Sequence, residues 1–131
     1  GYLGDASDTL YLIVQAETAA ALDAVEEIAA VDGVDAVYFG PGDHAASRGK
    51  LGQAGDPEVT AAIDAAAAKV RAAGKAAGVL AASPQLAERH VRNGYHFVSV
   101  ANDAAMLFAA AETAAKTHRA IASECRIKTD G

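Results

Sequence analysis

The sequence has one cysteine, no tryptophan and no long apolar run. The single Cys125 excludes an internal disulfide framework and fits a reducing compartment. No apolar run approaches the roughly 20 residues that a membrane-spanning helix needs. The first residues, which begin with Gly1 rather than methionine, have neither the basic segment nor the apolar core of a signal peptide. We therefore expect a cytoplasmic protein, and the sequence is compatible with a piece of a longer one.

Positive charge is also scarce, with 11 lysines and arginines against 17 aspartates and glutamates. The formal net charge of −6 disfavours binding to nucleic acid or to an anionic membrane. The P-loop, the Gly-x-Gly-x-x-Gly dinucleotide motif and the Cys-x-x-Cys zinc pattern are absent from the sequence. What is present is a chain of 131 residues, long enough for one domain with a sizeable core.

Strand and helix patterns alternate along the chain. Short apolar runs typical of buried strands lie at residues 10–15, 34–39, 76–80 and 96–100. Each precedes a stretch with helical spacing of apolar residues, at residues 18–30, 56–73, 83–93 and from 102 onward. Asp56 and Ser83, each followed by a proline, are predicted N-caps. Beyond about Ser123 the helical pattern is lost, and we expect a loose tail.

Four β-α units predict an α/β fold with a parallel sheet. Two architectures share this pattern: a small doubly wound sheet, and half of an eight-stranded β/α barrel, whose usual length is about 250 residues. The pattern alone slightly favours the open sheet, because four strands cannot close a barrel. In either architecture, functional side chains gather at the carboxyl ends of the strands.

Two carboxylates stand at such ends. Glu17 and Asp43 follow the first and second predicted strands, so a parallel sheet would bring them to one mouth. Together they can hold a hard cation such as Mg²⁺ or Mn²⁺, act as an acid–base pair, or cap the helices that follow. Spacing alone does not choose between helix capping and the two functional uses.

The turn Gly40-Pro41-Gly42 lies directly before Asp43. Its glycines permit backbone angles that a side chain would forbid, and the proline fixes the bend between them. Backbone N–H groups in such a turn can approach a ligand carboxylate or phosphate closely. Glycine-rich turns also occur without function, so this signal is weak by itself.

A glycine-rich loop is expected over residues 44–55. Arg48 and Lys50 in this loop could serve an anionic substrate, but solvated side chains are the more common case. His44 is a candidate base or partner of Asp43, although an exposed loop histidine is again more common. The other histidines are interpreted as structural, and the cysteine as lacking an activating neighbour: His90, His96, His118 and Cys125.

These strand ends carry a resemblance to a known family. Residues 12–18 (Leu-Ile-Val-Gln-Ala-Glu-Thr) and 33–43 (Gly-Val-Asp-Ala-Val-Tyr-Phe-Gly-Pro-Gly-Asp) resemble the HpcH/HpaI group, the 4-hydroxy-2-oxoheptanedioate or class II pyruvate aldolases. Further matches lie at residues 56–59, 74–80 and 94–100. The resemblance covers nearly the whole chain, in the same order along the sequence.

The resemblance implies that the chain is the second half, strands five to eight, of a (β/α)8 TIM-type barrel. It implies that Glu17 and Asp43 ligate a divalent metal ion, Mg²⁺, Mn²⁺ or Co²⁺. The backbone of Gly42 and Asp43 would hold the carboxylate of pyruvate. The full set of implied substrate-binding residues is Gly40, Pro41, Gly42, Asp43 and Leu80.

The implied reaction is that of a carbon–carbon lyase. Pyruvate chelates the metal, which stabilises its enolate as a Lewis acid, and the enolate adds to an aldehyde. The same enolate forms when a 4-hydroxy-2-oxo acid is cleaved. Apart from the candidate His44, no catalytic residue is implied in this chain, because the family's catalytic histidine and substrate-binding arginine belong to the first half of the barrel.

The sequence departs from the family pattern at two places. Leu-Ser usually follows the aspartate, where His44-Ala45 stands, and Gly-Val-Asp usually ends the last strand, where Ala101-Asn102-Asp103 stands. Both departures lie at the rim of the implied pocket and bear on the preferred aldehyde.

A lone half-barrel leaves two sheet edges and an apolar interior exposed. We therefore expect an aldolase that needs a complementary N-terminal half, which is another chain, a cleaved segment or a second copy, and that forms a homo-oligomer. Two alternatives stay open: a non-catalytic half-barrel binding or assembly module, and a related lyase acting on citrate-like or acyl-CoA substrates.

Overall fold

The computed structural model describes residues 1–129, and the chain divides into two units, Gly1–Val100 and Ala101–Gly131. The elements of the first unit are, in chain order, α1 (Tyr2–Thr9), β1 (Ile13–Ala16), α2 (Ala19–Asp23), α3 (Val25–Ala30), β2 (Ala36–Phe39), α4 (Pro41–Ser47), α5 (Pro57–Ala72), β3 (Ala76–Leu80), α6 (Pro84–Arg92) and β4 (Phe97–Ser99). The second unit contains α7 (Asp103–Thr129).

The strands of the first unit form one sheet in the order β1-β2-β3-β4, and every neighbouring pair is parallel. In a doubly wound sheet the strand order reverses at a switch point, whereas the strands of a barrel follow one another in chain order. The predicted α/β fold with a parallel sheet is confirmed. Its strand order is consistent with part of a TIM-type barrel.

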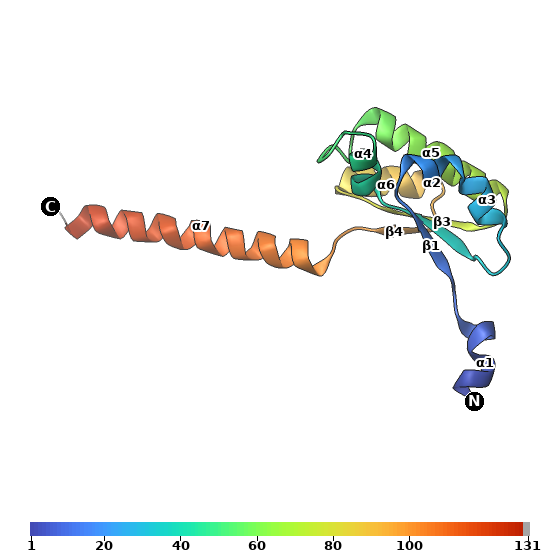
Figure 1. The fold of residues 1–131 in the computed structure, drawn as a ribbon. Coiled ribbons are helices and arrows are strands. Elements are labelled where there is room, and N and C mark those ends of the chain that lie inside the picture. The colour runs from blue at the N-terminus through green and yellow to red at the C-terminus, as the bar shows by residue number, and fades with distance from the viewer. Residues whose placement is uncertain (130–131) are drawn as a thin grey trace. The chain divides into compact units, whose positions relative to one another are not determined.

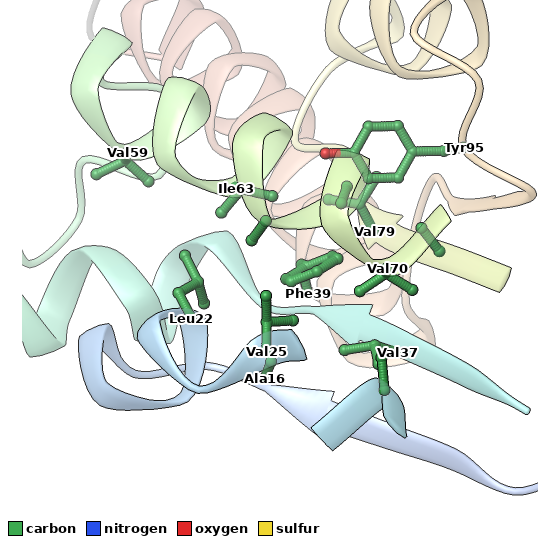
Figure 2. Packing of buried hydrophobic residues seen from close by; sticks show 14 of the residues in the cluster. Ala16, Leu22, Val25, Val37, Phe39, Val59, Ile63, Val70, Val79 and Tyr95 are labelled. Atoms are coloured by element: carbon green, nitrogen blue, oxygen red, sulfur yellow. The ribbon is translucent and has the colours of Figure 1, made fainter. Parts of the chain in front are cut away.

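Helices α2 to α6 lie on one face of the sheet, with α5 at the centre of the layer (Figure 1). The core lies between this layer and the sheet, as Figure 2 shows. Alternate side chains of the strands, such as Val37 and Phe39 of β2, point into it and meet Ile63 and Val70 of α5. Because side chains alternate across a strand, the residues between them point to the other face of the sheet.

On that other face, two aromatic rings stack across the sheet. Tyr38, Gly78 and Phe97 are register partners on three adjacent strands. The Tyr38 and Phe97 rings lie 5.6 Å apart, centroid to centroid, at an angle of 15°. A Cβ atom on Gly78 would overlap the Phe97 ring, so the glycine provides the space in which the two rings meet.

Local sequence signals fix several element ends. Asp56 and Ser83 are N-caps as predicted: Asp56 accepts hydrogen bonds from the N–H groups of Glu58 and Val59, and Ser83 accepts one from Leu86. Three glycines that follow helices have positive φ angles, the conformation in which glycine is favoured: Gly33, Gly74 and Gly94.

Other elements differ from the prediction. The helix expected over residues 18–30 is divided at Ala24 into α2 and α3. An additional helix, α1, precedes the first strand, and that strand begins at Ile13 rather than at residue 10. Residues 10–12 come before the first register pair of β1 and β2, which is Ile13 with Ala36.

The described part of the second unit consists mainly of one long helix, α7. Its first turn is capped by Asn102, whose Oδ1 accepts a hydrogen bond of 2.8 Å from the N–H of Ala105. In contrast to the expected loose tail, the helix continues past Ser123 to Thr129, and the last two residues of the expected tail lie outside the described residues. The glutamate, arginine and lysine of this segment have high intrinsic helix propensity. The prediction missed this because it relied on the helical spacing of apolar residues. No described helix is long and apolar enough to span a membrane.

Candidate active site

Strands β1 and β2 bring the two candidate carboxylates to the same edge of the sheet. Ala16 pairs with Phe39 at the last register position of these strands, so Glu17 and Gly40 leave the sheet side by side. Asp43 follows in the first turn of α4. Both acids therefore stand at the rim formed by the carboxyl ends of the strands.

Glu17 is held in place by two neighbours. A Cβ atom on Gly40 would lie 2.7 Å from Oε1 and 3.0 Å from Cγ of Glu17, so a larger residue here would displace this carboxylate. From the same strand, Nε2 of Gln15 donates a hydrogen bond of 2.6 Å to Oε1 of Glu17. This hydrogen bond restrains the carboxylate, which therefore loses less conformational entropy when it binds a ligand.

Helix capping, the non-functional interpretation of the two acids, does not describe them. The N-cap of α2 is Thr18, whose hydroxyl accepts a hydrogen bond of 3.1 Å from the N–H of Ala21. The N-cap of α4 is Gly40, and no side chain caps this helix. Asp43 is exposed. Neither Glu17 nor Asp43 therefore caps a helix.

The Gly40-Pro41-Gly42 turn is the start of a helix, not of a long loop. Pro41 occupies the first position of α4, where its fixed φ angle suits a helix and its missing N–H is not needed. The helix then takes up residues 44–47, which the sequence predicted as loop. The first backbone bond runs from the N–H of His44 to the carbonyl of Gly40, at 3.0 Å. The N–H groups of Gly42 and Asp43 lie before it, where a helix offers no internal acceptor.

His44 lies on the opposite side of α4, and the expectation of an exposed loop histidine is wrong. Its side chain is 1% exposed, and neither ring nitrogen has a hydrogen-bond partner among the described residues. It borders a cavity of about 270 Å³ between α2, α4 and α5. Burial lowers the pKa of His44, and the nearby Arg48 lowers it further, whereas the Thr18 backbone and Asp23 oppose this change. His44 is therefore a neutral residue of the helix layer near pH 7.

The two cations that the sequence placed in a solvated loop have different surroundings. Lys50 bridges Asp56 and Glu58, with Nζ 2.9 Å and 2.6 Å from their carboxylate oxygens, and so ties the loop to the start of α5. Arg48 is exposed, as predicted, at the C-cap of α4. Lys50 is thus engaged by two acids and is not free for an anionic substrate.

Leu80 stands at the end of β3 and is half-buried. Together with Pro41 it lines a small cavity of about 10 Å³, which is close to the volume that a single water needs. The structure therefore brings these two predicted substrate-binding residues together. His90 of α6 borders the same cavity, and burial lowers its pKa, an effect that Asp64 opposes.

The donor set at the rim suits a hard divalent cation. Mg²⁺ commonly takes one or two protein carboxylates and keeps several waters, and Glu17 and Asp43 supply two such carboxylates. The space beside Gly40 leaves room for one of them. In the described part of the chain, no cluster of three or more histidine, cysteine or acidic side chains forms a fuller metal site. The residues present therefore fit a metal of the Mg²⁺ or Mn²⁺ type held by few protein ligands.

Comparisons with known proteins point in one direction. The family profile of HpcH/HpaI aldolase/citrate lyase matches residues 2–110. A hydroxypyruvate/pyruvate aldolase of Cupriavidus necator is 47% identical over 118 residues, which cover 90% of this chain and 44% of the relative. A 2-keto-3-deoxy-L-rhamnonate aldolase of Escherichia coli is 44% identical over 102 residues, 78% of this chain and 38% of the relative.

A solved structure gives the same result. The crystal structure of an HpcH/HpaI aldolase/citrate lyase family protein from Burkholderia cenocepacia has a TM-score of 0.78 and 37% identity, covering 90% of this chain and 46% of that one. The chain thus spans less than half the length of the curated relatives it matches. A profile match over residues 2–110, together with the fold and the rim described above, shows that this chain belongs to the HpcH/HpaI aldolase/citrate lyase family.

Proposed function

We propose that this chain is the metal-binding half of a class II aldolase that forms or cleaves 4-hydroxy-2-oxo acids. The observation that carries the proposal is the pair Glu17 and Asp43 at one rim of a parallel sheet. Relatives that are 44–48% identical to this chain support the proposal, because they are named aldolases. Several of them are named hydroxypyruvate/pyruvate aldolases. We therefore propose pyruvate or hydroxypyruvate as one substrate and an aldehyde as the other.

Each residue of the rim has a role in this proposal. Glu17 and Asp43 are the protein ligands of Mg²⁺, Mn²⁺ or Co²⁺, and Gln15 orients Glu17 through its hydrogen bond. The backbone N–H groups of Gly42 and Asp43 receive the substrate carboxylate, and Leu80 packs against the substrate. A bound divalent cation supplies Lewis-acid stabilisation of the enolate charge that develops on a pyruvate-type substrate.

The proposal includes a second half. The family resemblance assigns β1 to β4 to strands five to eight of a barrel, and the chain covers 44% of its relative from Cupriavidus necator. In this arrangement the catalytic histidine and the substrate-binding arginine come from an N-terminal half, and the assembled enzyme is a cytoplasmic homo-oligomer.

Isothermal titration with Mn²⁺, in the presence and absence of pyruvate, tests the site. Glu17→Gln and Asp43→Asn should each weaken Mn²⁺ binding at least about tenfold, because each removes one of two charged ligands. Glu27→Gln, at an exposed acid of α3, is the matched control and should leave binding unchanged. Equal Mn²⁺ affinity in all four proteins would remove the metal assignment.

Co-expression with the N-terminal half of an aldolase relative tests the activity. Restored cleavage of a 4-hydroxy-2-oxo acid supports the aldolase, whereas intact Mn²⁺ binding without activity favours a non-catalytic binding or assembly module. Activity assays with citrate-like and acyl-CoA substrates test the third alternative, a related lyase that acts on such compounds. The solved citrate synthase and citrate lyase neighbours are 21% and 24% identical to this chain and show the fold alone.

A further inference from the structure

A large polar cavity lies at the amino ends of the strands, opposite the rim of Glu17 and Asp43. Its volume is about 550 Å³. We name it the basal cavity; it is lined by Tyr11, Asp35, Arg71, Gly74, Lys75, Ala76 and His96. Asp35 directly precedes β2, Ala76 begins β3 and His96 directly precedes β4, so three adjacent strands define its floor.

Two cations of this cavity have no carboxylate partner in the described structure. Arg71 lies in the last turn of α5 and Lys75 in the turn before β3, and no ion pair involving either is found among the described residues. Nη1 of Arg71 is buried, and none of the described residues offers it a hydrogen-bond acceptor. The guanidinium lies 5.8 Å from the Tyr95 ring centre, a contact that favours the charge but satisfies no N–H group.

The acid that lines the basal cavity is already engaged. Oδ2 of Asp35 accepts a hydrogen bond of 2.7 Å from the N–H of Leu12, and its backbone carbonyl accepts one of 3.1 Å from Ala76. Asp35 therefore joins the entries of β1, β2 and β3. Its carboxylate offsets one of the two positive charges, so the lining with Arg71 and Lys75 carries one net positive charge.

His96 adds a third donor. Its Nδ1 accepts a hydrogen bond of 3.2 Å from the N–H of Ala77, so the neutral ring carries its proton on Nε2. The hydroxyl of Tyr11 also lines the cavity and donates a long hydrogen bond, 3.5 Å, to the backbone carbonyl of Asp35. The lining thus presents Arg71, Lys75 and His96 as donors beside the single carboxylate of Asp35, in a chain whose net charge is −6.

We propose that the basal cavity binds a small oxyanion, the phosphate or carboxylate group of a ligand. A guanidinium matches the geometry of such a group with paired N–H donors, and a neighbouring ammonium adds charge without a fixed direction. Arg71 and Lys75 line the cavity and have no described ion pair, so both can donate to such a group. This site is separate from the rim of Glu17 and Asp43, and the proposal does not depend on the aldolase function.

Amide NMR shifts of the ¹⁵N-labelled chain provide the test. The chain is titrated with inorganic phosphate and, separately, with acetate, while sodium chloride keeps the ionic strength constant. We expect saturable shifts confined to the lining, at residues such as Lys75 and His96. Tighter binding of phosphate identifies a phosphate group as the ligand moiety, and tighter binding of acetate identifies a carboxylate.

Variants separate the site from general charge effects. Arg71→Gln should weaken binding about tenfold or more and Lys75→Gln several-fold, since each removes a charged donor. Arg119→Gln and Lys116→Gln, on α7, make the same chemical changes elsewhere and should leave the affinity unchanged. Circular dichroism reports whether each variant folds. If Arg71→Gln unfolds the chain, Lys75→Gln alone decides, because Lys75 has no described ion pair to lose.

Two results would overturn the proposal. One is shifts that never saturate with either anion and that follow ionic strength alone. The other is an affinity that both lining variants leave as high as that of the two α7 controls.

Discussion

The Glu17 carboxylate packs directly against Gly40: a Cβ on Gly40 would lie 2.7 Å from Oε1 of Glu17. Gly40→Ala should therefore displace the Glu17 carboxylate without removing it. We expect Mn²⁺ affinity, measured by isothermal titration, to fall by about tenfold, in the range typical of groups that orient metal ligands. Gly55→Ala is the control, since it makes the same change away from the rim and no heavy atom lies within 4 Å of its added Cβ. Equal effects of the two substitutions would contradict the steric explanation.

Gln15 should act on the metal site through Glu17. Gln15→Leu keeps the size of the side chain but removes the hydrogen bond to Oε1, so we expect Mn²⁺ affinity to fall about tenfold, at the lower end of the range for ligand-orienting groups. Gln85→Leu, at an exposed position of α6, controls for the added apolar surface. Unchanged Mn²⁺ affinity in Gln15→Leu would mean that Glu17 needs no orienting partner.

Gly78 should be essential to the aromatic stack. Gly78→Ala places a methyl group in the volume of the Phe97 ring, and overpacking of this kind typically costs about 1–3 kcal/mol. Urea denaturation followed by circular dichroism measures the change in the free energy of unfolding. Gly55→Ala, at a glycine with open space around it, should change little. In a Phe97→Ala background the Gly78→Ala cost should largely disappear, and a cost that persists would place the strain elsewhere.

His44 should make the stability of the fold depend on pH. Its pKa is lowered in the folded chain, so the unfolded chain binds the proton more readily. The stability is therefore complete above pH 6.5, the ordinary pKa of histidine, and is lost as the pH falls through the lower pKa of the folded state. His90, whose pKa is also lowered, contributes in the same direction.

His44→Leu tests this interpretation. It removes two buried ring nitrogens without hydrogen-bond partners, so we expect the free energy of unfolding to rise by about 1 kcal/mol near pH 7. The loss of stability between pH 7 and pH 5, measured by urea denaturation, should become smaller. His118→Leu, at an exposed position on α7, should keep the original pH dependence. A His44→Leu variant with an unaltered pH profile would assign that profile to other groups.

The sequence predicted those features of the fold that short segments determine. Asp56 and Ser83 are N-caps because each combines an oxygen acceptor with a following proline, a local signal. The rim was predictable for a similar reason: parallel pairing of β1 with β2 is enough to place Glu17 and Asp43 at one edge.

Features that depend on tertiary packing were missed. His44 occurs in a polar, glycine-rich stretch, and only the packing of α4 against α2 and α5 explains its burial. The role of Gln15 as the partner of Glu17 depends on side-chain direction at the end of β1, where the sequence shows only a polar residue after an apolar run. The cations of the basal cavity belong to separate parts of the chain, and no motif links them.

The strand order has a consequence for whatever completes the sheet. Strands β1 and β4 each have a single neighbour, and all four strands run in one direction. Closing such a sheet with further parallel strands calls for crossover connections of about a dozen or more residues each, so a tight hairpin cannot do it. Any piece that closed the sheet with parallel strands would therefore consist of strands alternating with such crossovers.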